Sequence, residues 1–161
     1  MKVTRVVAFD PGYERLGVAV IERAHGRDTL VYSDCIRTDK NLPFPERLRL
    51  LGEATEKILK KFKPDAAALE NVYFEKNAKT ALLVSQVRGM LCYIAAAKGL
   101  TVWEYTPLEV KMAVTGYGRS DKRAIAALVP RLIALPPQKR LDDEMDAIAV
   151  GLTCLAATRG L

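Results

Sequence analysis

The stretch "VVAFDPGYERLGVAV", residues 6–20, decides the fold, because two apolar runs are separated by Pro11 and Gly12. Short runs rich in Val that are bounded by Pro and Gly are typical of consecutive β-strands. The first of these runs ends on an acid, Asp10. A buried strand that ends on a carboxylate needs solvent, a basic partner or a metal ion there, because an unpaired buried charge is costly.

The composition predicts a single domain over residues 1–161, since the chain is 50% hydrophobic and has no internal repeat or long linker. No charge-free apolar run is long enough for a membrane span, so we expect a cytoplasmic protein with no membrane partner. Three distant cysteines and one histidine give no disulfide framework or zinc site. The net charge of +6 favours a polyanionic partner.

The apolar periodicity predicts an ordered series of strands and helices. Three strands that form an antiparallel meander are expected at residues 2–9, 15–23 and 30–38. Further strands are expected at 63–70 and 100–107, and helices at 45–62, 77–98, 108–114, 121–135 and 142–157. This order predicts an α/β fold with a mixed five-stranded sheet flanked by helices, and it matches the ribonuclease H-like arrangement.

Four acids are predicted to converge at one end of this sheet. Glu70 ends a second buried strand, and Asp143 and Asp146 stand three residues apart on one face of the last helix. If the first and fourth strands are neighbours in the sheet, all four acids can meet. Carboxylates without a matching His or Cys cluster suit Mg²⁺ or Mn²⁺ rather than Zn²⁺. Two such ions about 4 Å apart can activate water and stabilise the leaving oxygen in phosphodiester hydrolysis.

Plainer interpretations exist for each acid on its own, and Glu70 could be a salt-bridge partner of Lys76 or Lys79. The sequence Asp10-Pro11-Gly12 can be an ordinary turn, and the run "DDEMD", residues 142–146, can be an acidic first helical turn that complements the helix dipole. Asp142 could compete with Asp143 as a metal ligand, and Glu144 adds another charge beside the expected site. The conjunction of the acids favours the metal site.

Four motifs in the same order resemble the Holliday junction resolvases of the RuvC type. They are "FDPG" at 9–12, "LENVYFEKNAKTALLVSQVRGM" at 69–90, "TPLEVKMAVTGYGRSDK" at 106–122 and "DEMDAIAVGL" at 143–152. The resemblance implies a homodimer that cuts two opposed strands of a four-way DNA junction with Mg²⁺ in recombination and repair. It also implies a branch-migration helicase complex as a partner, and Asp10, Glu70, Asp143 and Asp146 as the catalytic and metal-binding acids.

The same resemblance assigns roles in DNA binding. Tyr73 matches an aromatic position that stacks on a junction base, and Lys111 and Lys122 match basic residues near the scissile phosphate. Further basic residues on the motif-bearing segments are expected to form a weaker phosphate-binding surface: Lys76, Lys79, Arg88, Arg119, Arg123, Lys139 and Arg140.

Three other functions compete with junction resolution. A related nuclease could cut RNA or other branched DNA. The Asp-Pro-Gly loop also looks like the phosphate-binding loop of an actin-like phosphotransferase, although that fold needs two lobes and 161 residues are too few. A catalytically silent junction-binding module would have no reason to retain four unpaired acids.

Overall fold

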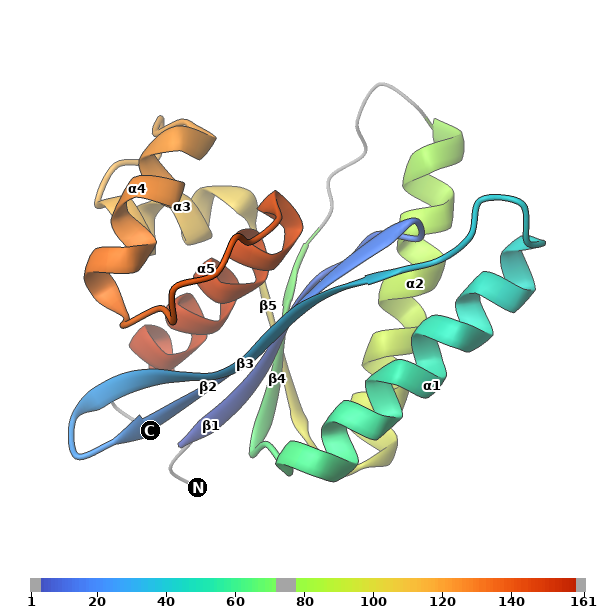
Figure 1. The fold of residues 1–161 in the computed structure, drawn as a ribbon, viewed down its shortest axis with the longest axis horizontal. Helices are drawn as coiled ribbons and strands as arrows, with labels where there is room; N and C mark the ends of the chain where they lie inside the picture. Colours follow the sequence, from blue (N-terminus) through green and yellow to red (C-terminus); the bar gives the residue numbers. More distant parts are fainter. Residues whose placement is uncertain (1–3, 72–77, 159–161) are drawn as a thin grey trace.

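A mixed five-stranded sheet forms the centre of the molecule in the computed structural model, which describes residues 4–71 and 78–158 (Figure 1). The strands are β1 (Arg5–Asp10), β2 (Arg15–Ala24), β3 (Arg27–Arg37), β4 (Ala66–Glu70) and β5 (Thr101–Tyr105), in the order β3-β2-β1-β4-β5. The first three strands are antiparallel, and β4 and β5 run parallel to β1. The predicted mixed sheet is confirmed, and β1 and β4 are neighbours.

Helices cover both faces of the sheet (Figure 1). The helices α1 (Phe44–Phe62) and α2 (Ala78–Ala97) pack on one face, and α3 (Pro107–Thr115), α4 (Lys122–Leu132) and α5 (Asp142–Ala157) lie on the other. Each face has its own apolar core, and both cores use β1 because its residues alternate between the two faces. Helix α5 is buried against β1 and β2, which positions its first turn at the end of the sheet.

The third strand begins earlier than predicted, at Arg27 rather than residue 30. His25 and Gly26 have φ angles of 51° and 77°, so both residues adopt the left-handed conformation of a tight two-residue turn. The hydrogen-bonded pairing of β2 with β3 therefore begins directly after this turn, at Arg27. The pairing then runs from Ala24 opposite Arg27 to Arg15 opposite Arg37, with one irregularity beside Val20. The turn and this irregularity together determine which side chains face each other at the far end of the hairpin.

Helix α5 approaches the backbone of β2 directly at Gly17. A Cβ atom at this position would lie 1.9 Å from the carbonyl oxygen of Asp143 and 3.3 Å from the Cβ of Asp10. No side chain fits there, so glycine is required for the first turn of α5 to rest against the sheet.

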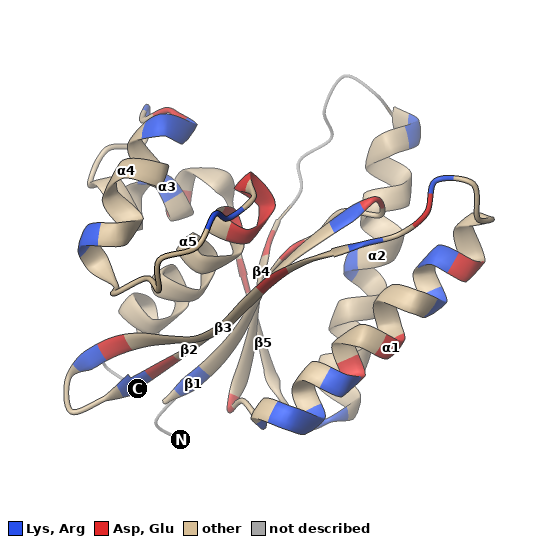
Figure 2. Ribbon diagram, in the orientation of Figure 1, with Lys and Arg blue, Asp and Glu red and all other residues tan. Residues whose placement is uncertain are grey.

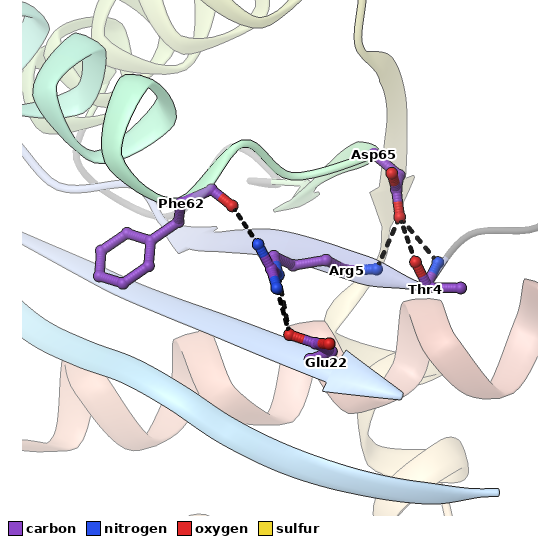
Figure 3. A network of polar contacts seen from close by, with 5 residues as sticks. All are labelled: Thr4, Arg5, Glu22, Phe62 and Asp65. Atoms are coloured by element: carbon purple, nitrogen blue, oxygen red, sulfur yellow. Dashed lines mark hydrogen bonds and ion pairs between the residues drawn. The ribbon is translucent and has the colours of Figure 1, made fainter. Parts of the chain in front are cut away.

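A polar network fixes β4 beside β1 at the opposite end of the sheet from Asp10 (Figure 3). Arg5 donates from Nε to the Glu22 carboxylate at 2.9 Å and from its guanidinium to the Phe62 carbonyl at 2.6 Å. The Asp65 carboxylate accepts from the backbone N–H groups of Thr4 and Arg5 at 2.9 and 2.8 Å, and from the Thr4 hydroxyl at 2.7 Å. The end of α1 and the start of β4 are thereby tied to β1.

Helix α2 is, by length and composition alone, apolar enough to cross a membrane. One side of it packs into the core through Val87, Leu91 and Ile94, which is the arrangement of a helix that covers a sheet. Leu82 and Tyr93, on the same helix, are 60% and 74% exposed. Much of the apolar surface of α2 is therefore left uncovered by this chain.

Candidate active site

The four acids singled out from the sequence lie at one end of the sheet. Phe9 pairs with Leu69, so the next residues, Asp10 and Glu70, stand on adjacent parallel strands about 4.8 Å apart. The start of α5 reaches the same end because Gly17 admits its backbone. Figure 2 shows the acidic start of α5 beside this part of the sheet.

The pKa of Asp10 reports how strongly the acids act on one another. Burial, followed by the charges of Glu70, Asp146 and Asp143 in that order of importance, raises this pKa from 3.8 to about 8, while Lys122 opposes the rise. The pKa of Glu70 is also raised, first by burial and then by Asp146. Around neutral pH the site therefore holds a proton that it would release to an incoming cation.

Two basic side chains already contact the acids of α5. Lys122 Nζ lies 3.1 Å from Asp146 Oδ2, and this contact raises the pKa of Lys122. Arg15 Nε lies 3.3 Å from Asp143 Oδ2 without making a hydrogen bond. Asp143 Oδ2 is buried and has no hydrogen-bond partner, so it is an acceptor left for a further ligand.

The acids suit a hard divalent cation. All their donor atoms are carboxylate oxygens, the ligands that Mg²⁺ and Mn²⁺ prefer, and Asp143 Oδ2, which accepts no hydrogen bond, is available for coordination. Across residues 4–71 and 78–158, no three His, Cys, Asp or Glu side chains stand in a preformed ion-binding arrangement. The chemistry of the donor set fits a metal ion, whereas Lys122 and Arg15 occupy positions beside two of the donors.

Glu144 does not face the acids. Its carboxylate accepts a hydrogen bond from the Ser33 hydroxyl at 2.5 Å and pairs with Arg140 Nε at 3.3 Å. The side chains of Arg140 and Glu144 are only 5% and 8% exposed. The expectation that Arg140 lies on a phosphate-binding surface is therefore wrong, because its guanidinium is buried against β3. Asp142 is exposed at the beginning of α5.

The other predicted basic residues differ in how near they lie to the acids. The charges of Lys111 and Lys122 partly oppose the rise in the pKa of Glu70, so both lysines lie beside the site. Arg88 forms an ion pair with Glu104 of β5, so its charge is compensated within the fold. Tyr73 and Lys76 lie outside the described residues. Arg15, which contacts Asp143, was not predicted as a site residue.

Known proteins share the sequence pattern over nearly the whole chain. The family model for "Crossover junction endodeoxyribonuclease RuvC" matches residues 6–154. A crossover junction endodeoxyribonuclease RuvC from Pelotomaculum thermopropionicum is 43% identical over 148 residues, which are 91% of this chain and 90% of that protein. The corresponding protein of Thermotoga maritima is 40% identical over 146 residues, or 91% and 87% of the two chains.

Solved structures share the fold. The structure of T. thermophilus RuvC in complex with a Holliday junction substrate matches with a TM-score of 0.89 and 28% identity, covering 98% of this chain and 96% of that chain. A yeast mitochondrial Holliday junction resolvase matches with a TM-score of 0.71, covering 97% and 82% of the two chains, and at 16% identity it supports the fold alone. The ribonuclease H-like architecture expected from the order of elements is confirmed.

Proposed function

Because this chain belongs to the RuvC family of crossover junction endodeoxyribonucleases and is a Holliday junction resolving endonuclease, we propose that its acids hydrolyse the junction with Mg²⁺. The proposed catalytic and metal-binding residues are Asp10, Glu70, Asp143 and Asp146. One observation carries this proposal: acids from β1, β4 and α5 act on one another strongly enough to help raise the pKa of Asp10 to about 8.

The elements give these residues separate tasks. Asp10 and Glu70 are held by the hydrogen-bonded ladder between β1 and β4, which fixes their spacing. Asp143 and Asp146 reach the site from α5. Two bound Mg²⁺ ions, or Mn²⁺ in their place, would activate the attacking water and stabilise the leaving oxygen. Lys111 and Lys122 would hold the phosphate beside the acids through their charges.

We propose that the active form is a homodimer that uses α2 as an interface. Leu82 and Tyr93 are exposed on this helix, and a groove of about 440 Å³ between α1 and α2 is lined mainly by apolar side chains, among them Leu48, Met90 and Ile94. A four-way junction has near two-fold symmetry, so an isologous dimer would present two identical sites and make paired symmetric cuts.

The expected contacts with DNA and with other proteins complete the proposal. Tyr73 would stack on a junction base, and Lys76 would add a phosphate contact. Arg88 would bind a phosphate only if its ion pair with Glu104 broke. A branch-migration helicase complex is the proposed partner, and the cytoplasm is the proposed place of action.

Cleavage of an end-labelled four-way junction tests the proposal. The wild-type protein should make paired nicks at symmetric positions with Mg²⁺, none with EDTA, and none in a linear duplex of the same sequence. Glu70→Gln should bind the junction and leave it uncut, because the amide keeps the shape but is a poorer metal ligand. Glu53→Gln, at an exposed position on α1 that does not line the groove between α1 and α2, is the matched control. Cutting by Glu70→Gln at the wild-type rate would refute the assignment of the acids.

A further inference from the structure

Two arginines face each other at the open end of the β2–β3 hairpin. Arg15 pairs with Arg37 across the antiparallel ladder, so both side chains lie on the same side of the sheet. Asp10 pairs with Gly17 on this side as well, and Gly17 pairs in turn with Cys35. Like charges directly opposite each other destabilise a sheet unless an anion lies between or beside them.

These arginines line a hollow of about 320 Å³ together with Glu14, Thr38 and Lys40. Three of its five lining residues are cationic and one is acidic, so the hollow is positive overall. Figure 2 shows basic stretches at the start of β2, at the end of β3 and in the loop that follows. Arg15, Arg37 and Lys40 are exposed, so their charged groups are accessible to a large ligand.

The wall of the hollow is held in place by hydrogen bonds. The backbone N–H of Thr38 donates to the Glu14 carbonyl at 3.1 Å, and the Thr38 hydroxyl donates to the Tyr13 carbonyl at 2.7 Å. Arg47, which is buried, donates from Nε to the same hydroxyl at 2.8 Å. The backbone that carries the cations is thus fixed before any ligand binds.

The hollow borders the acids of the active site. Arg15 Nε lies 3.3 Å from Asp143 Oδ2. Asp143, Arg37 and Arg15 all act on the pKa of the Cys35 thiol, which places the two arginines and this acid around one side chain. A ligand in the hollow would therefore lie next to the site of cleavage and not within it.

We propose that this hollow binds a backbone phosphate of the junction strand beside the scissile phosphate. Guanidinium groups match the geometry of phosphate oxygens and form charge-assisted hydrogen bonds with them. An open, shallow hollow suits a DNA backbone that continues on both sides. The bound phosphate would remove the repulsion between Arg15 and Arg37 and hold the cut strand in register with the acids. This inference rests on the proposed junction cleavage.

Binding of a fluorescent junction in EDTA at several salt concentrations tests the inference. The variant is Arg37→Gln with Lys40→Gln. The matched control is Lys57→Gln with Lys60→Gln, which removes two exposed charges from a hollow at the other end of α1. Loss of one phosphate contact should weaken binding roughly tenfold and reduce the slope of log K against log salt by about 0.9. The control pair should leave both quantities as in the wild type.

Junctions with a single uncharged methylphosphonate locate the contact. At one position beside the scissile phosphate, the substitution should weaken binding of the wild type and the control but not of the Arg37→Gln, Lys40→Gln variant. If every position weakens all three proteins equally, or if the variant keeps the wild-type slope, the inference is wrong while junction cleavage stands. If the wild type itself fails to bind the junction, both proposals fall.

Discussion

Replacing Asp10 with Asn should stabilise the metal-free protein while it abolishes cleavage. The folded state holds the Asp10 proton far more tightly than the unfolded chain, because burial and three nearby carboxylates raise its pKa from 3.8 to about 8. An acid whose pKa is raised in the folded state contributes stability below about pH 4, and this contribution is lost as the pH rises through about 8. Asn carries no charge and avoids this loss.

The size of the effect follows from the pKa and from the surroundings of the carboxylate. A rise from 3.8 to about 8 corresponds to roughly 6 kcal/mol at about 1.36 kcal/mol per pH unit. This is an upper limit, because Asp10 keeps partial contact with solvent, which screens part of the repulsion. An effective gain of about 2–3 kcal/mol raises the melting temperature by roughly 5–10 °C for a chain of this length.

Thermal unfolding in EDTA between pH 4 and pH 9 measures this difference. The melting temperatures of the wild type and of Asp10→Asn should nearly coincide at pH 4 and diverge until about pH 8, with the variant higher. Glu53→Gln, which changes an exposed acid on α1 outside the groove between α1 and α2, should follow the wild type throughout. Mg²⁺ should then raise the melting temperature of the wild type more than that of Asp10→Asn. Parallel curves for the wild type and Asp10→Asn across this range would refute the argument that Asp10 is held in a repulsive, desolvated site.

Three further outcomes follow from the structure and the sequence. Glu144→Ala should lower stability by about 3–5 kcal/mol, because it leaves the charge of Arg140 buried and unpaired; a melting temperature equal to that of the wild type would contradict the buried pair. Tyr73→Ala should slow junction cleavage more than it weakens junction binding, since stacking on a splayed base acts on the cut geometry; an unchanged rate would show that Tyr73 has no such role. Raising salt should weaken junction binding steeply in a titration followed by fluorescence anisotropy, and a flat response would refute phosphate contacts by the basic surface.

The position of the acids could be predicted because it depends on local patterns. Asp10 and Glu70 each end a short apolar run, and parallel strands joined through a helix bring such ends to one edge of a sheet. Asp143 and Asp146 share a helix face by their spacing alone. Only the adjacency of β1 and β4 had to be assumed, and the structure confirms it.

The surroundings of the acids depend on long-range geometry and could not be predicted in this way. Glu144 follows Asp143 directly, but consecutive helical residues point about 100° apart, and only the position of β3 shows that Glu144 meets Ser33. The pairing of Arg15 with Arg37 depends on the register of the hairpin, and a strand assumed to start at residue 30 does not specify that register.

Gly17 has no functional group, yet the close contact with α5 makes it as constrained as a catalytic residue. The contact joins two main chains, so no compensating change in a neighbouring side chain can restore it once a Cβ is present. In a library that tests every amino acid at every position for junction cleavage, Gly17 should tolerate as little as Asp10 does. A residue beside an active site can therefore be invariant because two elements of the fold approach closely there, even when it takes no part in the chemistry.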